Sequence, residues 1–166
     1  MSIEIIFSKE INIKWEEISG YRDFFTKIFN NITDFNKEKI DIIVMIISEL
    51  LENVVKYTSN HVSFLKIYFE RDVINGNYLH IILENDRNSQ SENDYKNLLK
   101  IVSEINSYED YEQMYLDFAQ KFLENPDGKS QFGMALIRKL TGGSKIIVGE
   151  GSYFVPGTQI KLCAAL

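Results

Sequence analysis

Apolar and polar positions repeat with two different periods along the chain, and the period of each segment predicts whether it is a strand or a helix. Runs of alternating or β-branched residues predict strands over 3–8, 62–70, 78–84, 144–150 and 158–164. Apolar residues at helical spacing predict helices over 14–32, 37–57, about 95–106, 109–124 and 134–143. Asn36 is the expected N-cap of the second helix, and Asn75-Gly76 predicts a hairpin turn between two strands.

This order of elements indicates an α+β protein. It runs strand, helix, helix, strand, strand, helical segment, helix, strand, strand, which is typical of a two-layer α/β sandwich. We expect one domain over 1–166, because no linker, repeat or low-complexity segment interrupts it. The segment 86–131 is the part that looks like a lid or helical insert. Its aromatic residues either pack on the domain's own core or dock another chain.

Composition and charge narrow the function classes. The formal charge of -6 and the pI of about 5.0 argue against a nucleic acid or an anionic membrane as the main partner. A single cysteine, Cys163, excludes an intrachain disulfide. The most apolar window is interrupted by Asp41, Glu49 and Glu52, and the N-terminal residues lack the pattern of a signal peptide, so we expect a cytoplasmic protein.

One helical stretch combines three chemically active side chains. Residues 48–57 read "SELLENVVKY", and helical spacing places Glu49, Asn53 and Lys56 on one stripe, with Tyr57 one turn beyond Asn53. A carboxylate can act as a general base, a carboxamide oxygen suits Mg²⁺, and an ammonium neutralises a phosphate. The plainer alternative is a solvated helix face.

Four segments carry a resemblance to a known superfamily. They are "ELLENVVKY", "LENDRN", "GKSQFGMALIRKLTGG" and "PGTQIKL", and they occur in the order of the boxes that mark GHKL ATPases. The chain resembles most closely the short, single-domain SiaB-like protein kinases, which act beside the anti-sigma-factor kinases. The resemblance implies the Bergerat, or histidine kinase-like ATPase, fold: a mixed sheet covered on one face by helices, with a helical insert in the lid region.

The resemblance also implies roles for the polar stripe. Glu49 matches the catalytic position that orients or deprotonates the attacking hydroxyl. Asn53 matches the Mg²⁺-binding asparagine of the nucleotide site, and Lys56 matches a basic position that contacts phosphate. ATP and Mg²⁺ are therefore the expected cofactors.

The remaining nucleotide-binding positions follow from the other boxes. Asn85 matches the residue that reads the adenine amino group, with Asp86 as the rival candidate, although the family normally has an aspartate followed by glycines there. Gly128 and Gly133 match the second glycine box, and Gly133 is expected to precede a short helix whose N–H groups hold phosphate. Thr158 matches the threonine near the adenine ring.

Two classes of function follow from the resemblance. The first is an ATP-dependent Ser/Thr protein kinase in a bacterial partner-switching pathway, with a small protein of the anti-anti-sigma type as its substrate and a homodimer as a further candidate assembly. The second is a degenerate GHKL-fold module that regulates a partner by binding without catalysis. Glu49 and Asn53 favour the kinase, whereas the altered adenine box favours the binding module.

Overall fold

The computed structural model describes residues 2–72, 76–125 and 129–165. The strands are β1 (Ser2–Asn12), β2 (Val62–Asp72), β3 (Gly76–Asp86), β4 (Ile147–Glu150) and β5 (Gly157–Ala165). The helices are η1 (Trp15–Glu17), α1 (Ile18–Ile32), α2 (Lys37–Tyr57), η2 (Arg87–Ser89), α3 (Glu92–Ser107), α4 (Tyr111–Glu124) and α5 (Lys129–Leu140). The predicted order of elements is confirmed, and so is the α+β class.

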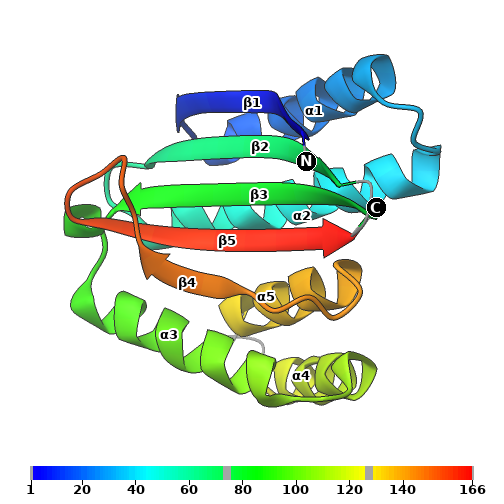
Figure 1. Ribbon diagram of the computed structural model, residues 1–166. Coiled ribbons are helices and arrows are strands. Elements are labelled where there is room, and N and C mark those ends of the chain that lie inside the picture. Colours follow the sequence, from blue (N-terminus) through cyan, green and yellow to red (C-terminus); the bar gives the residue numbers. More distant parts are fainter. Residues whose placement is uncertain (1, 73–75, 126–128, 166) are drawn as a thin grey trace.

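The five strands form one sheet in the order β1-β2-β3-β5-β4 (Figure 1). All four neighbouring pairs of strands are antiparallel, so the predicted mixed sheet is wrong for the described strands. The reason is the place of β5, which lies between β3 and β4 and runs against both. β2 and β3 pair as the predicted hairpin, but Asn75 lies outside the described residues.

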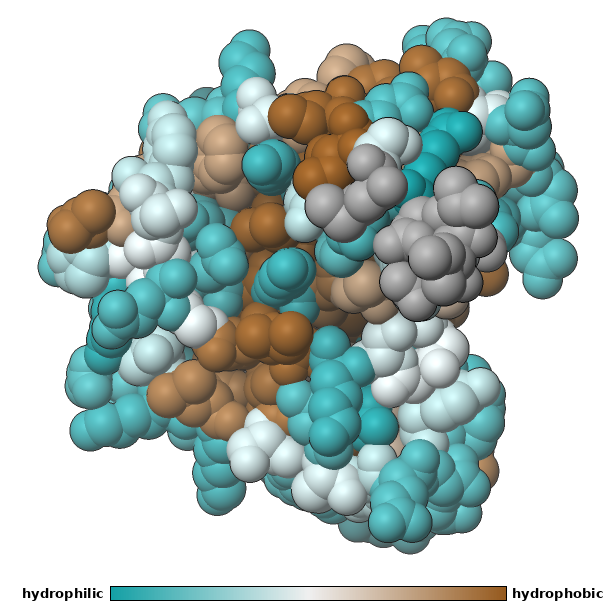
Figure 2. All heavy atoms as spheres, viewed as in Figure 1, coloured by the Kyte–Doolittle hydropathy of each residue, from teal (hydrophilic) through white to brown (hydrophobic). Residues whose placement is uncertain are grey.

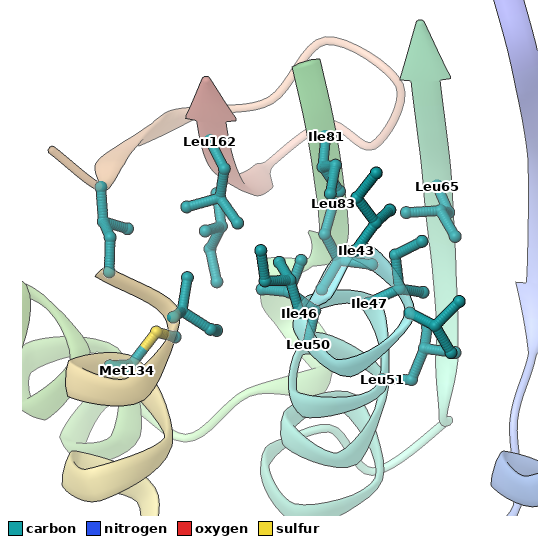
Figure 3. Packing of buried hydrophobic residues seen from close by; sticks show 14 of the residues in the cluster. Ile43, Ile46, Ile47, Leu50, Leu51, Leu65, Ile81, Leu83, Met134 and Leu162 are labelled. Atoms are coloured by element: carbon teal, nitrogen blue, oxygen red, sulfur yellow. The ribbon is translucent and has the colours of Figure 1, made fainter. Parts of the chain in front are cut away.

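The helix α2 has the predicted bounds and the predicted cap. Asn36 accepts a hydrogen bond on Oδ1 from the backbone N–H of Lys39 (2.9 Å), which satisfies one of the free donors at the helix start. Its apolar side chains, Ile43, Ile46, Ile47, Leu50 and Leu51, point at Leu65, Ile81 and Leu83 of the sheet (Figure 3). Burial of this face fixes the direction of the opposite, polar side of α2.

Within the described residues, helices cover one face of the sheet and leave the other open. α1, α2 and α5 lie behind the sheet in Figure 1. Along β2 the side chains accordingly alternate between buried and half-buried. Leu65 and Ile67 are completely buried, whereas Lys66 and Tyr68 between and beyond them are half-buried on the open face. Figure 2 shows this open face, on which apolar patches are separated by polar residues.

The segment 86–131 contributes to the core of the domain. Ile105 of α3 and Met114 and Phe118 of α4 are buried within the main hydrophobic cluster. The rings of Tyr115 and Phe122 both lie against Phe132 of α5, with centroid distances of 5.4 and 5.2 Å, so these half-buried aromatics join α4 to α5. α3 lies beside β4, at the edge of the sheet, and α4 packs against α5 (Figure 1).

The start of α5 corrects a prediction. The helix begins at Lys129, not after Gly133, because Phe132 packs on α4 and extends the helical segment toward the N-terminus. Gly133 is therefore the fifth residue of the helix and does not lie at its N-terminus.

None of the helices within the described ranges has both the length and the apolar character that a membrane span requires.

Candidate functional site

A cavity of about 170 Å³ lies between the C-terminal half of α2, the sheet, α3 and α5. Its polar lining is rich in carboxamides: Asn53, Asn85, Gln90, Asn97 and Gln131, together with Tyr57 and Asp94. Its apolar lining comprises Leu83, Leu98, Ile101, Met134 and Ile160. Apolar walls with a few convergent polar groups are typical of small-molecule sites.

Unpartnered polar atoms concentrate at this cavity. Four buried side-chain nitrogen or oxygen atoms in the described part of the chain have no hydrogen-bond partner. Asn53 Nδ2 and Gln90 Oε1 belong to the cavity lining, and Thr158 Oγ1 belongs to the strand pair beside it; the fourth, His80 Nδ1, belongs to a strand residue outside the lining. Leaving a buried polar group unpaired costs about 1–3 kcal/mol, so such atoms indicate bound water or a ligand.

The polar stripe of α2 begins at Glu49. Its carboxylate lies against the backbone of α5, where a Cβ atom added to Gly133 would stand 2.7 Å from Glu49 Oε2. Burial raises the pKa of Glu49, and the nearby Glu52 raises it further, while Lys56 and Arg22 lower it. A half-buried carboxylate with a raised pKa is a stronger base than an exposed one.

Asn53 and Tyr57 face the cavity, one and two turns after Glu49. Asn53 is 8% exposed, and its unpartnered Nδ2 can donate to a ligand oxygen or ring nitrogen. The structure therefore places the catalytic candidate and the metal-binding candidate in adjacent turns of one helix. Asn53 lines the cavity, whereas Glu49 lies outside its lining and against Gly133.

Lys56 points away from this cavity. Its Nζ forms an ion pair with Glu52 (3.2 Å) and lies 5.4 Å from the ring centroid of Trp15. Glu52 also pairs with Arg22 of α1 (3.2 Å). No lysine or arginine is among the side chains that the structure shows lining the cavity, where Asp94 is the charged residue.

Asn85 and Thr158 lie opposite each other on β3 and β5. Both are buried, at 4% and 1% exposed. The Oδ1 atom of Asn85 accepts a hydrogen bond from Ser63 Oγ on β2. Asp86, the rival candidate, instead accepts from the backbone N–H of Asn88 (2.9 Å) and caps η2.

The two glycine positions have different outcomes. Gly133 is buried on α5 against Glu49, and it is thus beside the site although not at a helix N-terminus. Gly128 lies outside the described residues.

Gln90 is the functional candidate that the sequence pattern missed. It lies in the polar segment between β3 and α3, which has no hydrophobic periodicity. The only local signal is its position between two capped turns, one closed by Asp86 and one by Ser91.

The residues present fit a Mg²⁺ ion that arrives with a nucleotide. No group of three or more His, Cys, Asp or Glu in the described ranges is arranged to hold a metal by itself. The carboxamide oxygen of Asn53 is a hard ligand, and Glu49 lies one turn earlier on the same helix. Mg²⁺ commonly takes one or two protein oxygens and completes its shell with phosphate and water.

Comparisons with known proteins bear on the fold. No protein-family model matches the sequence, and no curated protein matches it either. A chain in the crystal structure of the SiaB-SiaC complex from Pseudomonas aeruginosa matches with a TM-score of 0.61. The match covers 98% of this chain and 91% of that chain, with 10% sequence identity. At this identity the likeness concerns the architecture: the chain has a SiaB-like fold over nearly its whole length.

Proposed function

We propose that the chain is a Mg·ATP-dependent Ser/Thr protein kinase of the GHKL type, with the cavity beside α2 as its nucleotide site. One combined observation carries this proposal. The cavity lining contains buried polar atoms without hydrogen-bond partners, and Glu49, a carboxylate of raised pKa, lies one turn from Asn53 in that lining. The SiaB-like architecture supports it.

In this mechanism the sheet end of the cavity holds the base of ATP, and Asn53 faces the phosphates. Mg²⁺, held by the amide oxygen of Asn53, would neutralise charge on the phosphate oxygens. Glu49 accepts the proton of the partner's Ser or Thr hydroxyl, and that oxygen attacks the γ-phosphorus. The bond between the γ-phosphorus and its bridging oxygen breaks, ADP leaves, and the proton remains on Glu49 until solvent takes it.

The phosphate acceptor in this proposal is a small protein of the anti-anti-sigma type in a partner-switching pathway. The chain of similar fold was crystallised in a complex named for two proteins, SiaB and SiaC, which supports a protein partner here. Self-association is the alternative assembly. Sedimentation of the chain alone, and of the chain with a partner obtained by affinity capture, distinguishes a homodimer from a complex with another protein.

A second function has a specific observation in its favour. A site for a triphosphate ordinarily has a basic side chain, yet Lys56 is paired with Glu52 and Trp15 away from the cavity. This arrangement favours a module that regulates a partner by binding without phosphoryl transfer.

The variant Asn53→Ala separates the two functions. If Asn53 holds Mg²⁺ beside the phosphates, the parent chain should bind ATP more tightly with Mg²⁺ than without it, and Asn53→Ala should lose that difference while melting normally. Asn30→Ala, an exposed asparagine on α1, is the matched control and should keep it. An Asn53→Ala chain that still responds to Mg²⁺ contradicts the assignment, and a parent chain without any response favours the binding module.

A further inference from the structure

Hydrogen bonds hold the backbone of Gln90 and its neighbours just before the start of α3. The backbone N–H of Gln90 donates to the carbonyl of Arg87 (3.1 Å), and Ser91, the next residue, is the N-cap of α3. The preceding residue, Ser89, accepts a hydrogen bond on its carbonyl from the backbone N–H of Ser59, just after α2 (2.8 Å). The backbone of Gln90 is therefore tied both to α2 and to α3, and its side chain lines the cavity between them.

Two carboxamides of the lining, Asn85 on β3 and Gln90 just after η2, have side-chain oxygens that differ in their availability to a base. Asn85 Oδ1 already accepts from Ser63 Oγ. Gln90 Oε1 is buried and has no hydrogen-bond partner among the described residues. Because the amide of Asn85 turns its oxygen toward Ser63, its nitrogen is the group left to face a ligand.

These two groups are complementary to one nucleobase edge. Adenine presents an amino donor at C6 next to a ring-nitrogen acceptor at N1, so it matches one acceptor and one donor on the protein. A guanine edge presents a carbonyl oxygen and an N–H at the same two positions, and would place like groups against each other. A preorganised acceptor that cannot otherwise be satisfied discriminates strongly against a ligand without the donor.

We propose that Gln90, through Oε1, accepts a hydrogen bond from the 6-amino group of adenine and is the residue that selects adenine nucleotides. This assignment rests on the proposed function, because it requires that the cavity bind a nucleotide. It transfers the acceptor role expected of Asn85 to a residue five positions later, and gives Asn85 the donor role instead.

The test compares Mg·ATP with Mg·purine riboside 5′-triphosphate, which lacks only the 6-amino group. By calorimetry, the parent chain should bind ATP about tenfold more tightly than the analogue, as expected for one buried hydrogen bond. Gln90→Met, which keeps the length and loses the acceptor, should bind ATP no better than the analogue while its affinity for the analogue is unchanged. Gln90→Glu keeps an acceptor and should retain the preference. Gln120→Met, the same change at an exposed glutamine of α4 outside the lining, should also retain it.

Two results would overturn the assignment while leaving nucleotide binding in place. One is a parent chain that binds both triphosphates equally. The other is a preference that survives in Gln90→Met but disappears in Ser63→Ala, which would show that Asn85 reads the amino group. A parent chain that binds neither triphosphate refutes the proposed function itself, and the assignment of Gln90 falls with it.

Discussion

Two glutamates in this molecule show how differently a buried carboxylate can be placed. Glu84, on β3, is 2% exposed and accepts hydrogen bonds from three successive backbone N–H groups, those of Ser152 (3.1 Å), Tyr153 (2.6 Å) and Phe154 (2.7 Å). Glu49, on α2, is half-buried against Gly133, and burial raises its pKa. The first carboxylate is fully satisfied, and the second is held ready to bind a proton.

The surroundings of the two glutamates differ in the same way. Near Glu84 the loop between β4 and β5 is fixed on the open face of the sheet, where the ring of Tyr153 stacks on Phe64 with a centroid distance of 4.2 Å. Near Glu49 the next turn of α2 carries Asn53, whose Nδ2 has no partner. Satisfied polar groups stabilise the fold, whereas unsatisfied ones beside a cavity are available to a ligand.

The largest expected effect comes from Glu49→Gln. The amide cannot accept the proton of the attacking hydroxyl, so phosphoryl transfer should fall by about a hundredfold or more, while ATP affinity stays within a few-fold. Transfer from radiolabelled ATP to the partner obtained by affinity capture measures the first quantity, and calorimetry measures the second. Glu38→Gln, an exposed glutamate on the same helix, is the matched control. Transfer at the parental rate in Glu49→Gln would exclude the role of general base.

Glu84→Gln should instead act on stability. An amide in place of the carboxylate brings an NH₂ group toward backbone donors, and the lost charge-assisted hydrogen bonds should lower the free energy of unfolding by about 3 kcal/mol. Urea denaturation measures the loss, and Glu150→Gln, at an exposed position of β4, is the control. A Glu84→Gln chain as stable as the parent would show that the three contacts contribute little.

Gly133→Ala should reduce catalysis by pushing Glu49 aside. The new Cβ would stand 2.7 Å from Glu49 Oε2, and the flexible glutamate, rather than the backbone, should move. A displacement of this kind should reduce transfer by roughly tenfold with little change in stability. Gly20→Ala on α1, where a Cβ meets nothing within 4 Å, serves as control.

Non-additivity distinguishes this cause from a general disturbance of α5. In a Glu49→Gln background the same Gly133→Ala change should have no further effect on transfer, because the group that it displaces is already inactive. Full additivity of the two changes would contradict the contact as the cause.

The smallest expected effect is a shift of pH dependence in Glu52→Gln. Transfer should rise with pH as Glu49 loses its proton, with a midpoint above the usual range because the pKa of Glu49 is raised. Removing Glu52 removes one cause that raises this pKa and frees Arg22 and Lys56, which lower it, so the midpoint should move to lower pH. A midpoint that stays in place or rises would contradict this electrostatic explanation.

The same raised pKa predicts a stability change of known sign. Between the ordinary and the raised pKa of Glu49 the folded chain binds more protons than the unfolded chain, so its free energy of unfolding should decrease as pH rises through that window. Glu49→Gln should remove this decrease, which urea denaturation at several pH values measures.

Local patterns in the sequence predicted the elements and part of the site. Helical spacing predicted α2 to its ends, since a cap at Asn36 and one continuous apolar face determine it. The resemblance assigned Asn85 and Thr158 to one site, and the structure places them opposite each other because their strands pair in register.

Other features depend on contacts between distant segments, and sequence patterns do not contain them. Lys56 turns toward Glu52 and Trp15 because η1 lies beside the end of α2, which no periodicity reveals. Gln90 lies in a polar turn whose position is fixed by hydrogen bonds to residues elsewhere in the chain. The antiparallel sheet follows from the insertion of β5 between β3 and β4, a matter of topology rather than of pattern.

Calorimetric titration of the unmodified chain with ATP, with and without Mg²⁺, is the most direct test of whether the cavity lined by Asn53 is a nucleotide site. Saturable binding of one ATP per chain is expected, tighter in the presence of Mg²⁺, and it should weaken in Asn53→Ala but not in Glu84→Gln at temperatures where both are folded. Absence of binding at millimolar ATP would contradict a nucleotide site and leave the chain as a binding module with a SiaB-like fold.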